Sequence, residues 1–401
     1  MVDGEEARTI GARLRQIRKS RRKSLVVTAG LAGMSKSQLD RIERGEVALD
    51  RISQILALAE ALRIAPSELT KLPVPAPGNG EADAAITAVR RAVVAVSLDR
   101  PAGGVLPVEE LQRGVDRVLK ARRRCRFVEV GTALPGLIQD LHSSIAAGRA
   151  LDQLLPLAVI LHVHVTRMWL DDAGASEDLR REVALLARDL AYQHGETTTL
   201  GVAAFGTAYT LLANGMLELA RDELDSLHTP PTTAQTAGLI GGLTMTHALI
   251  AAVDQRYGDT LAPMQAATEL AARFGELGEN DPLGFGFGPT NVGMRGMELA
   301  LESGEPDRAI NIATGVHPLR LPHATRQASS YWVRYGRALA RVRGRQNDAV
   351  RAFRTAESLF PTRVHRDPIV REILAELLAR SRRDAIGREL HGMAYRAGLP
   401  L

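Results

Sequence analysis

The sequence has little cysteine and few aromatic residues. Cys125 is the only cysteine among 401 residues, which excludes an intramolecular disulfide and a cysteine-based zinc site. Aromatic residues make up 4% of the chain, whereas Ala, Leu, Arg and Glu are abundant, and this composition favours helices over sheets. The longest apolar runs fall short of the roughly 20 residues that a membrane helix needs, and the N-terminus has no apolar signal segment. We therefore expect a cytoplasmic protein without a membrane partner.

Acidic residues are also missing from one stretch near the N-terminus. From Arg8 to Leu39 there are nine Lys and Arg residues and no Asp or Glu. Residues 1–72 carry 14 Lys and Arg against 9 Asp and Glu, a net charge of +5, which equals the net charge of the whole chain. Such a segment can neutralise DNA phosphates. The alternative is an ordinary solvated helix face.

Residues 24–44 have the pattern of a helix-turn-helix. Ala29 is small enough for a second helix to cross the first closely, and Gly33 can adopt positive φ in the sharp turn. Leu39 and Ile42 stand three apart on one face of the second helix. Ser35, followed three residues later by Gln, matches a capping box. These four features at fixed spacing predict binding to double-stranded DNA.

The chain divides into two helical parts. Apolar spacing predicts five helices in residues 1–72, with Asp50 as the N-cap of the fourth. A Pro- and Gly-rich linker at residues 73–81 cannot continue a helix. Helical patterns separated by Gly, Pro and Asp then fill residues 82–401. The predicted fold class is all-α.

Helix-pair repeats are visible in the second part. Ala349, Phe353, Ala356 and Pro361 fit four positions of a tetratricopeptide (TPR) repeat in register. Weaker copies contain Ala309 and Ala313, and Ala220, Leu224 and Leu227. The units that contain Ala309 and Ala349 are 40 residues apart, instead of the usual ~34. We therefore predict a degenerate TPR-like α-solenoid, with an irregular helical domain as the alternative.

Residues 8–72 resemble the phage-repressor-like (Cro/C1, XRE) helix-turn-helix domain, including the segment 42–45, Ile-Glu-Arg-Gly, that closes its recognition helix. Joined to a TPR-like region, this domain is similar to the actinobacterial XRE–TPR regulators and, in layout, to peptide-responsive quorum-sensing regulators of Gram-positive bacteria. The resemblance implies a five-helix, lambda-repressor-like domain in a transcriptional regulator. Leu25 departs from the family, which often has a DNA-gripping Gln there, so Ser24 or Lys23 is expected to anchor the phosphate.

The recognition helix supplies the candidate DNA contacts. In this fold it lies in the major groove, and its N-terminal residues meet base edges. Because its apolar residues face inward, its polar side chains are expected to point outward, unless they form only a solvated surface. The candidate base-reading residues are Lys36, Ser37, Gln38 and Arg41. The candidate phosphate contacts are Arg13, Arg15, Ser24, Arg44 and Arg51.

A Gly-rich stretch at residues 281–297 invites a nucleotide-binding interpretation. It has no Gly-Lys-Ser/Thr sequence and no preceding strand, so both phosphate-loop templates fail. We expect a flexible connection capped by Thr290 or Asn291.

The helices after this stretch carry the candidate effector groove. Asn291 and Arg295 are one turn apart, and Tyr331, Arg334 and Arg337 lie on the next helix expected to line the concave side of the solenoid. Resemblance to peptide-responsive regulators implies effector contacts from such residues. Packing and surface ion pairs are the alternative.

Metal and catalytic sites are not expected. His162 and His164 are two residues apart, so on a helix they diverge by about 200° and cannot share an ion. No nucleophile–base pair or carboxylate pair has interpretable spacing. We expect neither cofactor nor metal, and no enzyme.

Together these features predict a sequence-specific transcriptional regulator that binds a pseudo-palindromic operator as a homodimer. Its helical region is large enough to dimerise the protein and to sense a peptide or small-molecule effector. The alternative is a DNA-tethered scaffold whose TPR-like groove docks a partner protein.

Overall fold

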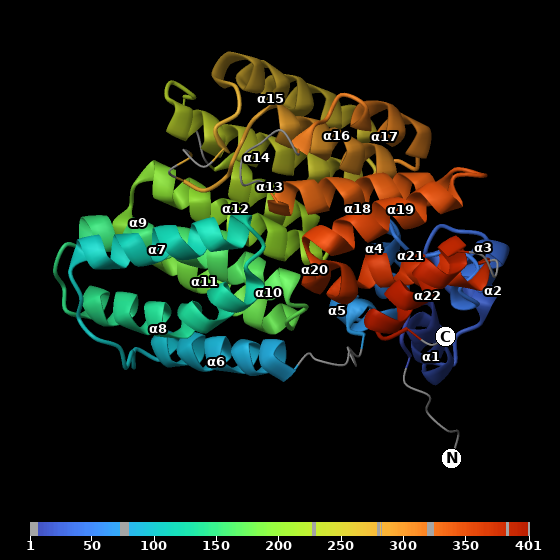
Figure 1. The fold of residues 1–401 in the computed structure, drawn as a ribbon, viewed down its shortest axis with the longest axis horizontal. Coiled ribbons are helices and arrows are strands. Elements are labelled where there is room, and N and C mark those ends of the chain that lie inside the picture. The colour runs from blue at the N-terminus through green and yellow to red at the C-terminus, as the bar shows by residue number, and fades with distance from the viewer. Residues whose placement is uncertain are drawn as a thin grey trace.

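The computed structural model describes residues 7–72, 80–226, 230–278, 281, 283–318, 325–381 and 385–399. Within these ranges the secondary structure is helical and contains no β-strand, which confirms the predicted all-α class. Figure 1 shows a small N-terminal domain at one end of a larger helical region.

The helix-turn-helix domain comprises residues 7–72 and has the five helices expected from the sequence. They are α1 (Ile10–Ser20), α2 (Leu25–Leu31), α3 (Lys36–Glu43), α4 (Ile52–Leu62) and α5 (Pro66–Thr70).

Serine side chains cap the two helices of the motif. The Ser24 hydroxyl accepts a hydrogen bond from the Val27 N–H (3.2 Å), and the Ser35 hydroxyl accepts one from the Gln38 N–H (3.1 Å). Between these helices, Gly33 has a φ of +66°, a conformation that costs glycine little. These local features fix where α3 begins and how it leaves the turn.

One apolar core holds the five helices together. Leu39 and Ile42 of α3 are at most 1% exposed and share a cluster with Leu14 and Leu58. Helix α1 crosses α3 so closely that a Cβ at Gly11 would collide with the Ile42 carbonyl. The recognition helix is therefore anchored along its whole inner face.

The helical region comprises residues 80–399. Its first helices are α6 (Gly80–Ser97), α7 (Val108–Arg123), α8 (Phe127–Ala146), α9 (Leu151–Ile160), the π-helical η1 (Leu161–Arg167), α10 (Met168–Asp172), α11 (Glu177–His194), α12 (Thr197–Ala213) and α13 (Leu217–Asp225). They are followed by α14 (Ala234–Val253), the 3₁₀ turn η2 (Tyr257–Thr260), α15 (Leu261–Phe274), α16 (Pro289–Glu302), α17 (Pro306–Ala313), α18 (Thr325–Arg341), α19 (Gln346–Leu359), α20 (Pro361–Arg366), α21 (Pro368–Ala379) and α22 (Ala385–Arg396). The predicted linker falls outside the described residues, except for Gly80 and Glu81, with which α6 begins.

Consecutive helices form the predicted pairs. Helix α18 packs against α19, where Ala349, Phe353 and Ala356 are fully buried. The Phe353 ring lies against Gly336 of α18, so the glycine lets the two helices approach.

The two weaker repeats are helix pairs as well. Helix α16 packs against α17, which buries Ala309 and Ala313, and α12 packs against α13, which buries Ala220 and Leu224. Leu227 lies outside the described residues. The helical-repeat architecture expected from the sequence is therefore present.

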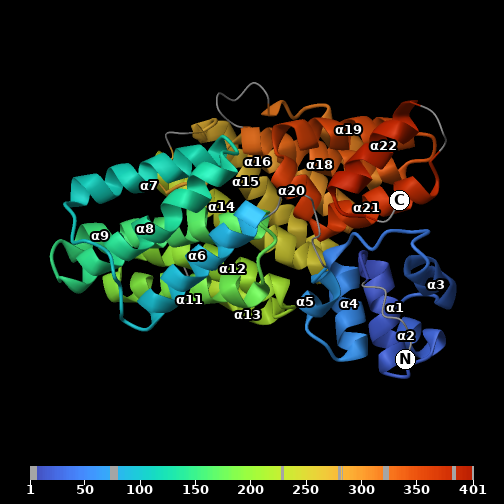
Figure 2. The same ribbon diagram turned by 60° about the horizontal axis from the view of Figure 1, so that its bottom comes forward.

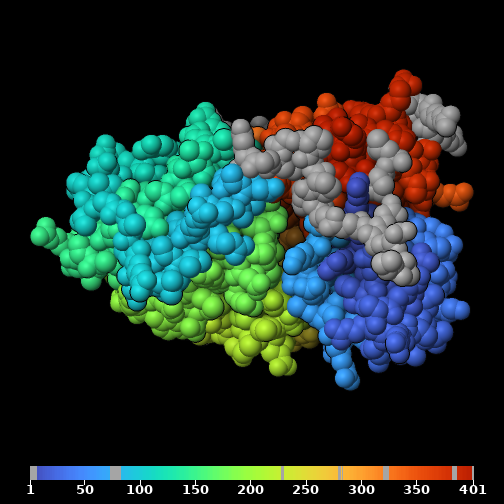
Figure 3. Space-filling model, turned by 90° about the horizontal axis from the view of Figure 1, so that it is seen from below, coloured from blue at the N-terminus to red at the C-terminus, as the bar shows by residue number. Residues whose placement is uncertain are grey.

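The C-terminal helices return to the domain at the start of the chain. Helices α21 and α22 lie beside the helix-turn-helix domain in Figures 1 and 2, and α21 contacts α1. Figure 3 shows the helix-turn-helix domain, in blue, seated against the C-terminal helices. The helix-turn-helix domain is thus docked on the helical region.

Contrary to the expectation from the apolar runs, two described segments, Leu151–Asp172 and Ala234–Val253, are long and apolar enough to cross a membrane. In each, 78% of the most apolar 18-residue window is buried inside the fold, as expected for core helices of a packed domain.

The two histidines singled out in the sequence lie on η1 and are buried. His162 Nε2 lies 2.9 Å from His142 Nε2, and the His164 ring packs edge-on against Phe285 with centroids 4.7 Å apart. Burial lowers the pKa of all three histidines, that of His142 to about 4. Across the described residues, no group of three or more His, Cys, Asp or Glu could hold a metal ion.

Candidate DNA-binding surface and ligand cavity

The candidate base-reading residues lie on the outer face of α3. Lys36, Ser37 and Arg41 are exposed, and Gln38 is half-buried behind them. Arg41 Nε lies 3.7 Å from Glu46 Oε2, and both side chains are nearly half exposed. An exposed ion pair at this distance is weak, so Arg41 can leave it for a base edge.

The candidate phosphate contacts divide into three groups. Arg15 and Ser24 are exposed, and Ser24 also caps α2. Arg44 is exposed but pairs with Asp40 at 2.9 Å and with Glu46 at 2.8 Å.

Arg13 and Arg51 are directed elsewhere. Arg13 Nε donates to the Glu68 carbonyl on α5 (2.9 Å). Arg51 lies against Gly304, where a Cβ would collide with its guanidinium group. Arg51 therefore faces the helical region, whereas Arg15 faces solvent.

One arginine of the basic stretch has a structural position. Arg18 Nε and Nη2 donate to the two carboxylate oxygens of Glu43 at 2.5 and 2.6 Å, and Nη1 donates to the Lys23 carbonyl. Hydrogen bonding to Glu43 is the main cause that raises the pKa of Arg18. This buried pair ties α1 to the end of α3.

A carboxylate of the helical region caps α4 of the helix-turn-helix domain. Glu302 accepts hydrogen bonds from the backbone N–H groups of Ile52 (3.1 Å) and Ser53 (2.7 Å). These are N–H groups that the first turn of a helix leaves without an internal partner. The prediction that Asp50 is the N-cap of α4 was wrong. The residue before α4 is Arg51, whose side chain makes no capping hydrogen bond.

Two carboxylates of α21 also accept hydrogen bonds from backbone N–H groups of the helix-turn-helix domain. Glu372 accepts from the N–H groups of Ile10 (2.7 Å) and Gly11 (3.1 Å) at the start of α1. Glu376 accepts from the Ala48 N–H at 2.8 Å. We call Glu302, Glu372 and Glu376 the docking carboxylates. All three are at most 4% exposed.

Asp50 takes part in this interface from the other side. Its carboxylate accepts from Arg341 Nε at 3.0 Å, and its carbonyl accepts from Arg337 Nη2 at 2.8 Å. Arg341 also pairs with Glu376 at 2.6 Å. The interface is therefore polar, buried and charge-paired.

Burial raises the pKa of Glu372 to about 7, although its hydrogen bonds with Ile10 and Gly11 favour the charged form. The charge of Glu376 adds to the rise. The interface thus contains a carboxyl group of the helical region whose pKa lies near neutral pH.

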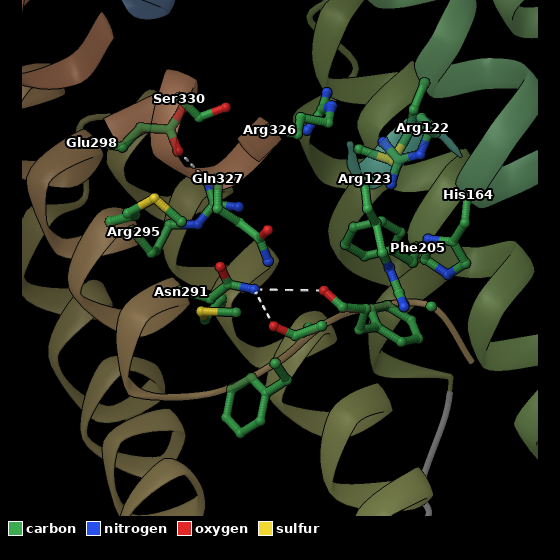
Figure 4. Close-up of a pocket in the computed structure, with 18 of the residues that line it drawn as sticks. Arg122, Arg123, His164, Phe205, Asn291, Arg295, Glu298, Arg326, Gln327 and Ser330 are labelled. Atoms are coloured by element: carbon green, nitrogen blue, oxygen red, sulfur yellow. Dashed lines mark hydrogen bonds and ion pairs between the residues drawn. The ribbon is translucent and has the colours of Figure 1, made fainter. Parts of the chain in front are cut away.

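A cavity of about 180 Å³ lies inside the helical region. Figure 4 shows Arg122 and Arg123 entering it from α7 on one side, and Arg295, Glu298 and Ser330 facing them from α16 and α18. The predicted groove residues Asn291, Arg295 and Arg334 all line this cavity.

The other two predicted groove residues lie elsewhere. The Tyr331 hydroxyl donates to the Ala313 carbonyl (3.2 Å), between two helix pairs. Arg337 donates to Asp50 at the domain interface. The cavity instead includes Arg122, Arg123 and Arg326, which sequence reasoning missed.

The Gly-rich stretch forms one wall of the cavity as a structured loop. Asp281 accepts from the N–H groups of Leu283 (3.0 Å) and Gly286 (2.6 Å), and Asn291 donates to the Gly286 carbonyl at 2.6 Å. The expected caps were wrong, because Gly288 precedes α16 and Glu276 accepts from the Thr290 N–H. Asn291 instead holds the loop, as Figure 4 shows.

Glu298 is the acidic residue at this cavity among the described lining residues. Burial alone would raise its pKa, but the Arg334 and Arg295 guanidinium groups outweigh this and lower it to about 2. Arg295 Nη1 lies 2.6 Å and Arg334 Nη2 3.1 Å from its carboxylate. Both cations are thus paired with one anion.

A second cavity, of about 460 Å³, separates α4 and α5 from the helical region. Glu298 and Arg334 line both cavities. On α16, Arg295, Glu298 and Glu302 follow each other at helical spacing, so one face of this helix runs from the first cavity to the docked domain.

Comparison with known proteins places the first domain. Residues 9–72 match the family described as "Helix-turn-helix domain". No curated protein matches the chain in sequence. Among solved structures, the chain is similar to Bacillus thuringiensis PlcR in complex with the peptide PapR7 and DNA, with 13% identity, a TM-score of 0.32, and coverage of 88% of this chain and 99% of that chain. A TM-score this low does not establish a common arrangement of helices. The N-terminal domain is a helix-turn-helix, the kind of domain with which transcriptional regulators bind DNA.

Proposed function

We propose that this chain is a transcriptional regulator that binds a specific double-stranded DNA operator through α3 and responds to an effector held in its helical region. Lys36, Ser37, Gln38 and Arg41 meet base edges in the major groove. Arg15, Ser24 and Arg44 contact phosphates.

One observation carries the proposal: α3 is anchored by its apolar face and presents a polar, cationic face to solvent. Leu39 and Ile42 are buried, whereas Lys36, Ser37 and Arg41 are exposed. A surface that is rigid behind and cationic in front suits direct readout of stacked base pairs.

The proposed active form is a homodimer on a pseudo-palindromic site. One domain of this size has a limited contact area, and a second copy supplies the remaining affinity. Two recognition helices then enter successive major grooves about 34 Å apart.

The proposed effector, a peptide or a small molecule, occupies the cavity between α7, α16 and α18. Arg295 and Arg334 have side chains only 11% and 19% exposed, which favours an enclosed ligand over a docked protein. A ligand there would contact Arg295 and Glu298 of α16. The same face of this helix carries Glu302, which caps α4.

Selection of duplexes from a random pool by the full chain tests the proposal. We expect enrichment of one motif in two inverted copies, with centres about 10 base pairs, or a multiple of that, apart. An unenriched pool at low salt would contradict DNA recognition. A single unpaired copy of the motif would contradict the dimer only.

A further inference from the structure

We propose that the cavity between α7, α16 and α18 binds a small organic carboxylate with an apolar, ring-sized body. This inference deepens the proposed function, because it names the chemical class of the effector.

The charges around the cavity favour an anion. Five arginines line it, from α7, α16 and α18, together with the single carboxylate of Glu298 among the described lining residues. Glu298 forms ion pairs with both Arg295 and Arg334. Arg326 is paired with Asp172, which it contacts through Nε and Nη2 at 3.0 and 2.9 Å.

Two nitrogen atoms of the Arg122 guanidinium group lack a hydrogen-bond acceptor. It is 7% exposed, and its Nε and Nη1 atoms are buried with no hydrogen-bond partner in the described part of the chain. Burial is the main cause that lowers its pKa, and the neighbouring Arg326 lowers it further. The charge of Asp172, which already pairs with Arg326 and Arg363, acts in the opposite direction. A buried guanidinium without an ion pair is costly, and a carboxylate beside Arg122 would supply the missing charge and hydrogen-bond acceptors.

Aromatic and thioether side chains form another part of the cavity wall. Phe205, Phe285 and Phe287 line it with Met245 and Met294. The Phe205 and Phe285 rings meet edge-on with centroids 5.0 Å apart. Thioether and aromatic groups suit an apolar or aromatic ligand body.

The volume limits the ligand's size. A cavity of about 150 Å³ holds one benzene molecule, and this cavity measures about 180 Å³. A ring or branched chain with one carboxylate fills that space. The structure therefore favours a small molecule of the two effector types considered.

Calorimetry and thermal unfolding of the full chain with benzoate as the probe test the inference. Benzamide, which has nearly the same shape without the charge, is the matched ligand. We expect benzoate to bind and to raise the unfolding midpoint, and benzamide to bind at least tenfold more weakly. Equal affinities would overturn the role of charge, and stronger stabilisation by inorganic phosphate than by benzoate would overturn the carboxylate assignment.

The variant Arg122→Met separates a ligand-binding arginine from a structural one. Because it removes an unpaired buried charge, we expect the midpoint without ligand to rise and the benzoate response to be lost. Arg117→Met, at an exposed position of the same helix, should preserve that response. A lower midpoint together with an unchanged benzoate affinity in Arg122→Met would overturn the proposal.

Failure of the ligand assignment can be distinguished from failure of the proposed function. A chain that selects an operator but does not distinguish benzoate from benzamide overturns only the ligand class. A chain that binds benzoate through Arg122 but enriches no duplex overturns only DNA recognition.

Discussion

The Glu302 carboxylate accepts a hydrogen bond from the backbone N–H of Ser53 at 2.7 Å, across 249 residues of sequence. Helix α4 of the helix-turn-helix domain is thus capped by a residue of the helical region, which also contains the cavity of about 180 Å³. The position of α4 therefore depends on the position of α16. Because α3 packs in the same core as α4, the position of α3 depends on α16 as well.

Loss of this cap should be measurable. Glu302→Ala leaves the buried N–H of Ser53 and the partly buried N–H of Ile52 without an acceptor, so we expect it to lower the free energy of unfolding by about 1–3 kcal/mol. Glu305→Ala, at an exposed position just beyond α16, should change it by less than about 0.5 kcal/mol. Chemical denaturation of both variants compares them, and equal effects would argue against the capping role.

Docking should depend on pH through Glu372. Its pKa is about 7 in the docked structure and 4.5 ordinarily, so the docked state binds more protons between these values. Docking is therefore strengthened as the pH falls from about 7 and weakened as it rises toward 7. Fluorescence energy transfer between labels on the two domains, recorded from about pH 5 to pH 8, should show this loosening. Glu372→Gln should flatten the profile, and an unchanged profile in that variant would assign the titration to another group.

The basic stretch should separate into structural and DNA-binding arginines. Arg18→Ala leaves the buried Glu43 carboxylate without its ion-pair partner. We expect this loss to lower the free energy of unfolding by about 3–5 kcal/mol. Arg15→Ala should leave stability nearly unchanged and lower the slope of log affinity against log salt by about 1. Denaturation and salt titration of both variants test this division. A stable Arg18→Ala protein would contradict the structural assignment.

Arg41 should affect specificity more than overall affinity. Arg41→Ala is expected to cost about 1–3 kcal/mol on the selected operator and to relax one base preference, whereas Arg15→Ala should weaken all sequences alike. Competition binding on the operator and on single-base variants measures both. Equal losses on specific and random DNA would remove Arg41 from the base-reading residues.

Ligand and DNA should be coupled through α16. If benzoate favours one position of the docked domain, it changes operator affinity by some factor, and operator DNA must change benzoate affinity by the same factor. Paired titrations in the presence and absence of the other ligand test this equality. Independent binding would mean that the cavity does not regulate DNA recognition.

Local features of the structure could be predicted from the sequence. The cap at Ser35, the turn at Gly33 and the buried face of α3 each depend on residues within a few positions of one another. The α18–α19 pair could also be predicted, because Ala349, Phe353 and Ala356 recur with the period of one helix face.

The docking carboxylates could not be found in this way. Glu302, Glu372 and Glu376 look like ordinary polar residues of amphipathic helices, and their partners are 249 to 362 residues away. The local rule that assigned Asp50 as a cap was overridden by Arg341, which pairs with it across the interface. Arg122 has no sequence signal either, because its burial results from helices brought together only in the fold.

Competition binding on the selected operator at physiological salt tests the central claim most directly. The wild-type chain should bind the operator at least 10³-fold more tightly than random duplex, and a Lys36→Ala/Arg41→Ala variant that unfolds normally should lose most of that ratio while still binding random DNA. Equal affinity of the wild type for operator and random duplex, or an unchanged ratio in the double variant, would contradict recognition by α3.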